Sequence, residues 1–278
     1  MKSLALFLLG LIPVFALAQT STLSAPSVEE DFRQRVLVVG FHSGKSYFSD
    51  CDLAIAGESK IRKVEVRDEF QDALEDAIIR RVGQNYATIG LSQKMDGRDG
   101  AFFKRYYHNI GFGYEVPTRL SGDDGEVKWG KKLRDRLSNI RLGQKKKEKG
   151  EKSMGPKEKE AFSYISTPEE QYLAAHWPAN SFLYDLVKTY HADYILTINQ
   201  FEVKTDYRKC VDRELGNFTR KIRVHFNLFS PQGECLFGDV VTVNYNSTTE
   251  DVENIIGDNF DLLSDFISSP LSMPISGN

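Results

Sequence analysis

The sequence has little cysteine, no excess of either charge and only one long apolar run. Its 278 residues include 3 cysteines, and 36 basic side chains nearly balance 39 acidic ones. A fold framed by disulfides needs an even and larger cysteine set. Proteins that bind nucleic acid usually present a basic face, which this charge balance does not supply. We therefore predict a globular protein that is stabilised by a hydrophobic core and does not bind nucleic acid.

The sequence also lacks the motifs of common catalytic and metal sites. No two of its five histidines have H-x-x-x-H spacing, and no G-x-S-x-G segment is present. Gly40–Ser46 resembles a phosphate loop after a buried strand, but its two glycines are one residue too close together to wrap a phosphate. These absences predict no catalytic residue, no metal ligand and no cofactor.

The one long apolar run is at the amino terminus. Lys2 precedes an apolar segment, and the small-x-small triplet Ala16-Leu17-Ala18 ends it. This arrangement is typical of an export signal over residues 1–18. The polar residues 19–34 then form a flexible leader. We expect the mature protein to be periplasmic or secreted, without a transmembrane span, because no second run approaches the roughly twenty apolar residues that a span needs.

Residues 35–91 have the pattern of a strand, a helix and a second strand. The valine-rich segment 35–41 predicts a buried central strand. Apolar residues recur at three- and four-residue steps over 67–82, which indicates one face of a helix. Residues 86–91 form a second strand. Such a unit favours two parallel strands with a right-handed crossover.

The second half of the chain predicts a helix followed by a three-stranded meander. A capping box at residues 167–170 predicts the start of a helix, and Asn180 can cap the next one. Strands are expected over 194–203, 220–229 and 235–245, with a hairpin turn at 230–233 and a last helix capped by Thr248. The expected fold is α/β, on the border of α+β: a mixed sheet of about five strands flanked by helices.

Residues 92–165 interrupt this pattern, and we interpret them as a large insertion after the second strand. The insertion lies within a single predicted domain that spans 35–278. The insertion carries many glycines, an amphipathic stretch at 129–142 that predicts one helix, and a charged tract at 145–160 that we expect to be disordered. It also carries aromatic and basic residues close together. These residues are the predicted partner-binding set: Phe102, Phe103, Arg105, Tyr106 and Tyr107. If buried, the same rings would instead anchor the insertion to the core.

Three further hypotheses stay open from the residues alone. A secreted hydrolase could have a dispersed site at His42, Ser43 and Asp50, beyond the end of the first strand. In a calcium- or glycan-binding module, the acidic-glycine stretches at 96–100 and 123–126 could hold calcium, and the aromatic and basic cluster at 102–108 could contact a glycan. A disulfide could join Cys210 to Cys235, because both lie at the ends of strands expected to be adjacent.

The segment His191-Ala192-Asp193-Tyr194-Ile195-Leu196, followed by the glycine-bearing hairpin at 222–234, resembles a domain of bacterial envelope proteins. The similar proteins are the curli secretion pore subunit, the outer-membrane activators of peptidoglycan synthases and the amino-terminal domain of the Tol translocation protein. The resemblance extends over residues 35–91 and 167–268 and implies binding and assembly rather than catalysis. The sequence has no acylated cysteine and no obvious pore-forming hairpins, so it departs from the pore subunit. We predict an exported, non-enzymatic envelope protein that binds a protein partner and could oligomerise.

Overall fold

The central element of the fold is a six-stranded mixed sheet. A computed structural model describes this sheet and its helices over residues 33–92, 94–118, 171–178, 181–212 and 217–272. Five strands follow the order β3-β1-β6-β7-β8, and β2 pairs with the middle of β6, at residues 201–203. Their bounds are Arg35–Val39 (β1), Tyr47–Ser49 (β2), Ala87–Leu91 (β3), Tyr194–Asp212 (β6), Asn217–Phe229 (β7) and Cys235–Asn246 (β8).

Strands β3, β1 and β6 are parallel, whereas β6, β7 and β8 form an antiparallel meander. Parallel pairing of β1 with β3 requires the crossover that the sequence predicts, and α2 (Lys63–Val82) provides it. The predicted mixed sheet of about five strands flanked by helices is confirmed, and the class is α+β.

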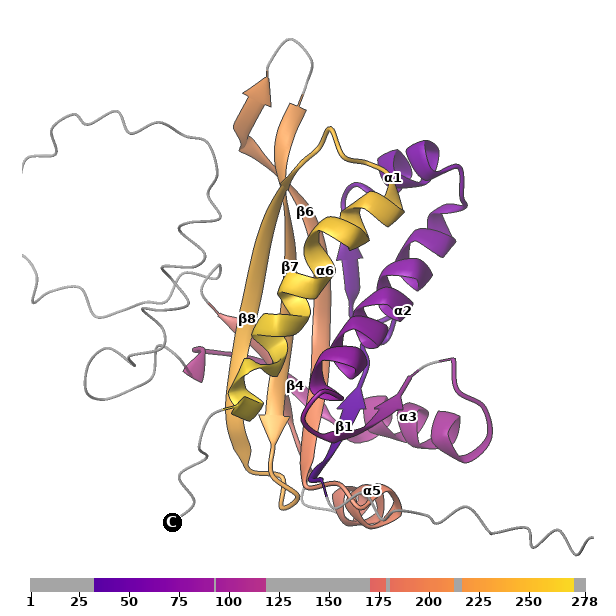
Figure 1. Ribbon diagram of the computed structural model, residues 1–278, viewed down its shortest axis with the longest axis vertical. Helices are drawn as coiled ribbons and strands as arrows, with labels where there is room; N and C mark the ends of the chain where they lie inside the picture. Colours follow the sequence, from indigo (N-terminus) through magenta and orange to yellow (C-terminus); the bar gives the residue numbers. More distant parts are fainter. Residues whose placement is uncertain (1–32, 93, 119–170, 179–180, 213–216, 273–278) are drawn as a thin grey trace, which may run out of the picture. The chain divides into compact units, whose positions relative to one another are not determined.

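One face of the sheet is covered by α1 (Asp52–Ser59), α2 and α6 (Val252–Ser268), with the short 3₁₀ helix η2 (Ser269–Ser272) after it. Figure 1 shows α2 and α6 side by side across this face. Alternation along each strand decides which residues they cover. Val36 and Val38 of β1 pack against these helices, and so do Ile222 and Val224 of β7.

The other face is covered by α3 (Gly97–Asn109), α5 (Phe182–Tyr190) and a small second sheet of β4 (Gly111–Glu115) and β5 (Tyr172–His176). Leu37 and Val39 of β1 point to this side and pack with the α3 aromatics. The predicted insertion therefore contains an ordered helix and strand. Its expected helix at 129–142 and its charged tract at 145–160 lie outside the described residues, as do the signal at 1–18 and the leader as far as residue 32.

The capping box at 167–170 predicts that a helix follows, but the structure has a strand there instead. Residues 172–176 form the strand β5, antiparallel to β4. Side chains of the main sheet reach the backbone of β5. Asn227 Oδ1 accepts the N–H of Ala175 at 2.9 Å, and Asn199 Nδ2 donates to the carbonyl of Leu173 at 2.8 Å. These tertiary partners satisfy backbone groups that a helix would have satisfied internally.

The last helix begins three residues later than expected. Asp251, not Thr248, is its N-cap, and its Oδ1 accepts the backbone N–H of Asn254 at 3.1 Å. An N-cap carboxylate satisfies one of the amide groups that the first turn leaves free.

The disulfide hypothesis is wrong, because Cys235 is a free thiol. Strand register gives the reason. Cys210 pairs with Phe218 at one end of β7, whereas Cys235 pairs with Phe229 at the other end. Eleven residues of extended strand separate these two positions on β7, which is roughly 35 Å. Disulfides need Cα atoms within about 7 Å.

Candidate functional site

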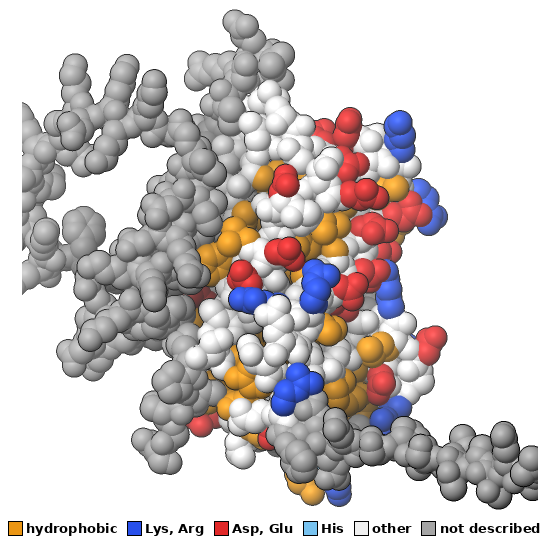
Figure 2. Space-filling model, viewed as in Figure 1, with side chains coloured by type: hydrophobic (Ala, Val, Ile, Leu, Met, Phe, Trp, Pro, Cys, Tyr) orange, Lys and Arg blue, Asp and Glu red, His pale blue; other side chains and the backbone are white. Residues whose placement is uncertain are grey.

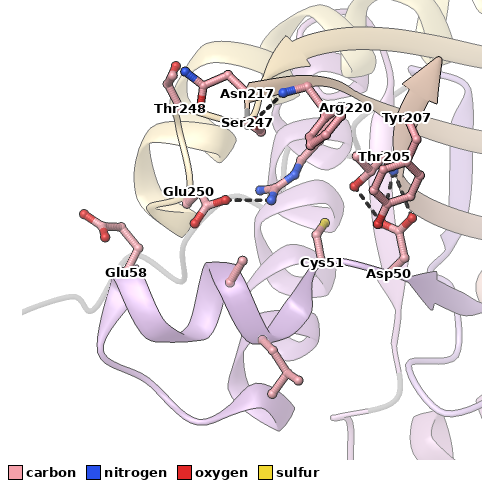
Figure 3. A pocket seen from close by; sticks show the side chains of 13 residues that line it. Asp50, Cys51, Glu58, Thr205, Tyr207, Asn217, Arg220, Ser247, Thr248 and Glu250 are labelled. Carbon is pink, nitrogen blue, oxygen red and sulfur yellow. Dashed lines mark hydrogen bonds and ion pairs between the residues drawn. The ribbon is translucent and has the colours of Figure 1, made fainter. Parts of the chain in front are cut away.

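A pocket of about 600 Å³ lies at the end of the sheet where β2 meets α1 (Figure 3). Its walls come from the β2–α1 junction, the distal parts of β6 and β7, and the segment between β8 and α6. The lining residues are Asp50, Cys51, Leu53, Ala54, Glu58, Thr205, Tyr207, Asn217, Phe218, Arg220, Ser247, Thr248 and Glu250.

Two sets of hydrogen bonds fix the pocket walls to the sheet. Asp50 accepts the backbone N–H of Thr205 at 3.0 Å and its hydroxyl at 3.1 Å, so the start of α1 is tied to β6. The Ser247 hydroxyl accepts the N–H of Phe218 at 2.8 Å, and the Ser247 N–H donates to the Phe218 carbonyl at 2.9 Å. The pocket is therefore built on strands and held by backbone contacts, which favours a preformed site.

Arg220 of β7 forms part of the floor. Only 6% of the residue is exposed, and its Nη2 donates to Glu250 Oε1 at 2.6 Å. Its Nε and Nη1 have no hydrogen-bond partner in the described part of the chain. Burial opposes the charge, but the neighbouring Cys51, Tyr245 and Glu250 outweigh it and raise the pKa of Arg220. The guanidinium therefore remains charged, and Glu250 is its ion-pair partner.

Cys51 lies beside this guanidinium, at the N-cap of α1. Figure 3 shows its sulfur pointing toward Arg220. The residue is 5% exposed, and its Sγ lies 3.6 Å from the Ser49 hydroxyl oxygen. Burial raises the pKa of the Cys51 thiol, whereas Ser49 and Arg220 act in the opposite direction. The Tyr245 hydroxyl is also close to this group, within hydrogen-bonding reach of Cys51 and Arg220.

The rim differs from the floor because it carries exposed apolar side chains. Leu53 of α1 is 75% exposed and Tyr207 of β6 is 66% exposed. The Tyr207 ring packs edge-on against Phe218, with the ring centroids 5.3 Å apart. An exposed leucine and tyrosine at the edge of one pocket are typical of a surface that contacts another molecule.

Carboxylates continue from the pocket into a smaller adjoining hollow of about 230 Å³. Glu58 and Glu250 line both hollows, and Asp251 and Asp258 line the second. Figure 2 shows many acidic side chains, with lysine and arginine side chains among them, over the helices of this face. Arg220 is the one basic residue among those that line the two hollows, and Glu250 already pairs with it. The surroundings of the pocket are therefore acidic.

The pocket lining is mostly polar and carries few of the groups that are common in catalytic sites. Cys51 is its one thiol, and no histidine is among its lining residues. Over the described ranges, no group of three or more histidine, cysteine, aspartate or glutamate side chains is arranged to hold a metal ion. General-base activation of a nucleophile needs a base within hydrogen-bond reach. The described lining offers polar contacts and shape rather than such a pair.

The aromatic residues predicted to bind a partner lie elsewhere and are buried. Phe102, Phe103, Tyr106 and Tyr107 form the inner face of α3 and pack in the second core cluster. The Tyr107 hydroxyl donates to the Gly40 carbonyl at 3.0 Å. The four rings anchor α3 to the sheet, so their prediction as a partner-binding surface is wrong. The fifth predicted residue, Arg105, is half-exposed, 3.6 Å from Asp185 and 5.0 Å from the centre of the Phe182 ring.

The hydrolase hypothesis placed His42, Ser43 and Asp50 together, and the structure separates their roles. His42 Nδ1 accepts the N–H of Gly44 at 3.1 Å, and its ring packs against Phe103 and Tyr107. Ser43 is buried. Asp50 lines the pocket and binds Thr205, whereas His42 and Ser43 are not among its lining residues. These contacts give His42 and Asp50 roles within the fold.

The acidic stretch at 96–100, considered above for calcium, is used within the fold. Asp96 is the N-cap of α3, and Asp99 Oδ1 accepts the Tyr190 hydroxyl at 2.6 Å. The stretch at 123–126 lies outside the described residues. The hypothesis of a calcium- or glycan-binding module gains no support from this geometry.

Comparison with known proteins does not assign a family. No family model and no curated protein matches this chain. Among the helices described, none combines the length and the apolar character that crossing a membrane requires. Inference about function therefore rests on the pocket and on the sequence.

Proposed function

We propose that this chain is an exported, non-enzymatic envelope or periplasmic protein, and that it binds a protein partner through the pocket between α1 and the distal ends of β6 and β7. The observation that carries the proposal is the position of two large exposed side chains, Leu53 and Tyr207, on the rim of a preformed polar pocket. The signal at residues 1–18 supports export, and the resemblance to envelope domains agrees with a role in secretion or envelope assembly.

The rim supplies the apolar part of the interface. Leucine and tyrosine side chains bury large apolar areas when a partner covers them, and about 25 cal/mol is gained per Å² removed from water. Tyr207 is also partly immobilised by its contact with Phe218, which reduces the entropy lost on binding. Because the pocket walls are tied to β6 and β7, little rearrangement is needed before a partner binds.

The floor and the adjoining hollow supply selectivity. Their carboxylates, from Glu58, Glu250, Asp251 and Asp258, favour a positively charged partner. We therefore propose that the partner presents a basic residue beside an apolar one on a short exposed segment. The apolar side chain contacts Leu53 and Tyr207, and the basic group faces the carboxylates.

Selection of peptides from a random library on the purified chain tests this proposal without knowledge of the source organism. Enriched sequences should combine a lysine or arginine with a neighbouring aliphatic or aromatic residue. Binding of the best peptide should weaken about tenfold or more in Leu53→Ala and Tyr207→Ala, as expected for interface anchors. Tyr184→Ala is the matched control, since Tyr184 is an equally exposed tyrosine on α5.

Two outcomes would contradict the proposal. One is enrichment of acidic peptides, which would show that the carboxylates do not select the ligand. The other is an affinity that falls in Tyr184→Ala and not in the two pocket variants, which would place binding on another surface.

A further inference from the structure

Two hydrogen-bond donors of the buried Arg220 side chain have no acceptor of their own beside Cys51. They are Arg220 Nε and Arg220 Nη1, and neither has a hydrogen-bond partner in the described structure. The Tyr245 hydroxyl lies within hydrogen-bonding reach of Cys51 and Arg220. Arg220 and Tyr245 both interact electrostatically with Cys51. Buried donors left unpaired cost free energy, so these two guanidinium donors point to an acceptor that is formed or bound there.

A protonated thiol is a poor acceptor and cannot satisfy these donors. A cysteine sulfenate, the first oxidation product of a thiol, differs because it carries a negatively charged oxygen one bond beyond Sγ. Such an oxygen on Cys51 extends toward the guanidinium, as the direction of the side chain in Figure 3 shows. Charge-assisted hydrogen bonds from arginine to an anion are about twice as strong as neutral ones.

We propose that Cys51 is a site of reversible oxidation by peroxide, and that Arg220 and Tyr245 hold its sulfenate. The adjacent pocket of about 600 Å³ gives a small oxidant a route to the sulfur. Arg220 is suited to this role because Glu250 holds only its Nη2, so the guanidinium is fixed in place while Nε and Nη1 stay free to donate.

The reaction is balanced with hydrogen peroxide as the oxidant. Cys51 loses its thiol proton, and the thiolate sulfur attacks one peroxide oxygen. An S–O bond forms as the O–O bond breaks, so the sulfur is oxidised by two electrons and the peroxide is reduced. The released hydroxide takes up the proton and leaves as water. The sulfenic acid then ionises, and Arg220 and Tyr245 donate to its oxygen.

This site is independent of partner binding, because oxidation at Cys51 requires no ligand in the pocket. Cys235 provides the internal comparison. It is a free and exposed cysteine whose sulfur lies 3.2 Å from Asn227 Nδ2, with a neutral amide where Cys51 has a guanidinium. Two full-length proteins are needed, one keeping only Cys51 (Cys210→Ser with Cys235→Ser) and one keeping only Cys235 (Cys51→Ser with Cys210→Ser).

Each protein is treated with hydrogen peroxide and its intact mass is followed with time. We expect the Cys51 protein to gain one oxygen that dithiothreitol removes, which distinguishes a sulfenate from methionine sulfoxide. This product should persist, whereas the Cys235 protein should proceed to higher oxides or to a disulfide-linked dimer. Arg220→Gln in the Cys51 protein should shorten the lifetime of the sulfenate about tenfold, the effect of losing roughly 1.4 kcal/mol of stabilisation.

Tyr245→Phe serves as a second variant because it removes one donor and leaves the Arg220–Glu250 pair in place. It should also shorten the lifetime, and circular dichroism checks that each variant is folded. The proposal is overturned if Cys51 stays reduced under conditions that oxidise Cys235. It is also overturned if the sulfenate decays equally fast with and without Arg220 and Tyr245 in folded proteins.

Discussion

The backbone N–H of Leu173 donates to Nδ1 of His225 at 2.8 Å, which links strand β5 to strand β7 of the main sheet. His225 is fully buried, and its Nε2 lies 3.6 Å from Glu202 Oε1. Because Nδ1 accepts this bond, the imidazole must be neutral at that atom. Burial lowers the pKa of His225, and Arg223 and Lys204 add to this effect, while Glu202 opposes it.

Acid should therefore weaken the fold through His225. The unfolded chain takes up a proton near the ordinary histidine pKa of about 6.5, and the folded chain takes it up only at a lower pH. The contribution of His225 to the free energy of unfolding is fully present above pH 6.5, and it is lost as the pH falls from 6.5 toward the pKa of His225 in the folded chain. The measurement is urea unfolding across this range for the native chain and His225→Asn. The native chain should lose stability relative to the variant as the pH falls, and parallel curves would contradict the assignment.

Glu75 should have the opposite pH dependence. Its carboxyl packs against Gly40 in the interior, and burial raises its pKa from 4.5 to about 8. The folded chain keeps this proton between pH 4.5 and 8 while the unfolded chain releases it, so stability from this group declines as the pH rises through that range. Glu75→Gln should abolish the decline and stabilise the fold at pH 7 by roughly 2–3 kcal/mol. Glu69→Gln, at an exposed position of the same helix, is the control and should change little.

Gly238 of β8 is required by the packing of the small sheet against the main one. A Cβ at this position would lie 1.9 Å from Tyr172 Oη and 2.6 Å from Asn227 Nδ2. Gly238→Ala should destabilise the fold by about 1–3 kcal/mol because neither neighbour can move freely. Tyr172→Phe should reduce the free energy of unfolding less in the Gly238→Ala background than in the native chain, because it removes the hydroxyl oxygen nearest to the added Cβ. Fully additive effects in thermal unfolding would contradict this explanation.

Gly57→Ala offers a matched comparison on the helix α1. Nothing lies within 4 Å of a Cβ there. Alanine in a helix is favoured over glycine by roughly 0.5–1 kcal/mol, so this substitution should raise the unfolding temperature. A loss of stability similar to that of Gly238→Ala would show that the clash with Tyr172 is not the cause.

Export predicts a specific amino terminus. Protein recovered from the cells that make it should begin at Gln19, because cleavage follows the Ala16-Leu17-Ala18 triplet. Intact-mass measurement identifies the cleavage position, and Ala18→Lys, which alters the small residue at the cleavage site, should leave the signal attached. Native chains that retain Met1–Ala18 in the cytosol would contradict the proposal of an exported protein.

The main sheet could be predicted because its signals are local. The valines of β1, the alternation along β7 and the proline-glycine turn at 230–233 each specify one element. The strand β5 could not be recognised, because Leu173, Ala174 and Ala175 suit a helix as well as a strand. Its conformation depends on hydrogen bonds from Asn199 and Asn227, which lie far away in sequence.

The candidate site had one usable signal in the sequence. Arg220 has the same parity as Ile222 and Val224, so alternation places it on the inward face of β7. A charged residue on an inward face needs a partner, and this predicts a buried ion pair. Its partner Glu250 and its neighbour Cys51 could not be identified, because only tertiary packing brings these three distant segments together. Burial of the α3 aromatics could not be predicted either, because burial of a helix face depends on what packs against it.

Hydrogen–deuterium exchange in the presence of the selected basic-apolar peptide tests the central claim most directly. We expect slower exchange at Asp50–Glu58, at Thr205–Tyr207 and at Ser247–Glu250, which surround the pocket, with no change at β4. Protection of β4 or α3 with unchanged exchange around the pocket would contradict the account, since it would place the partner on the opposite face of the sheet.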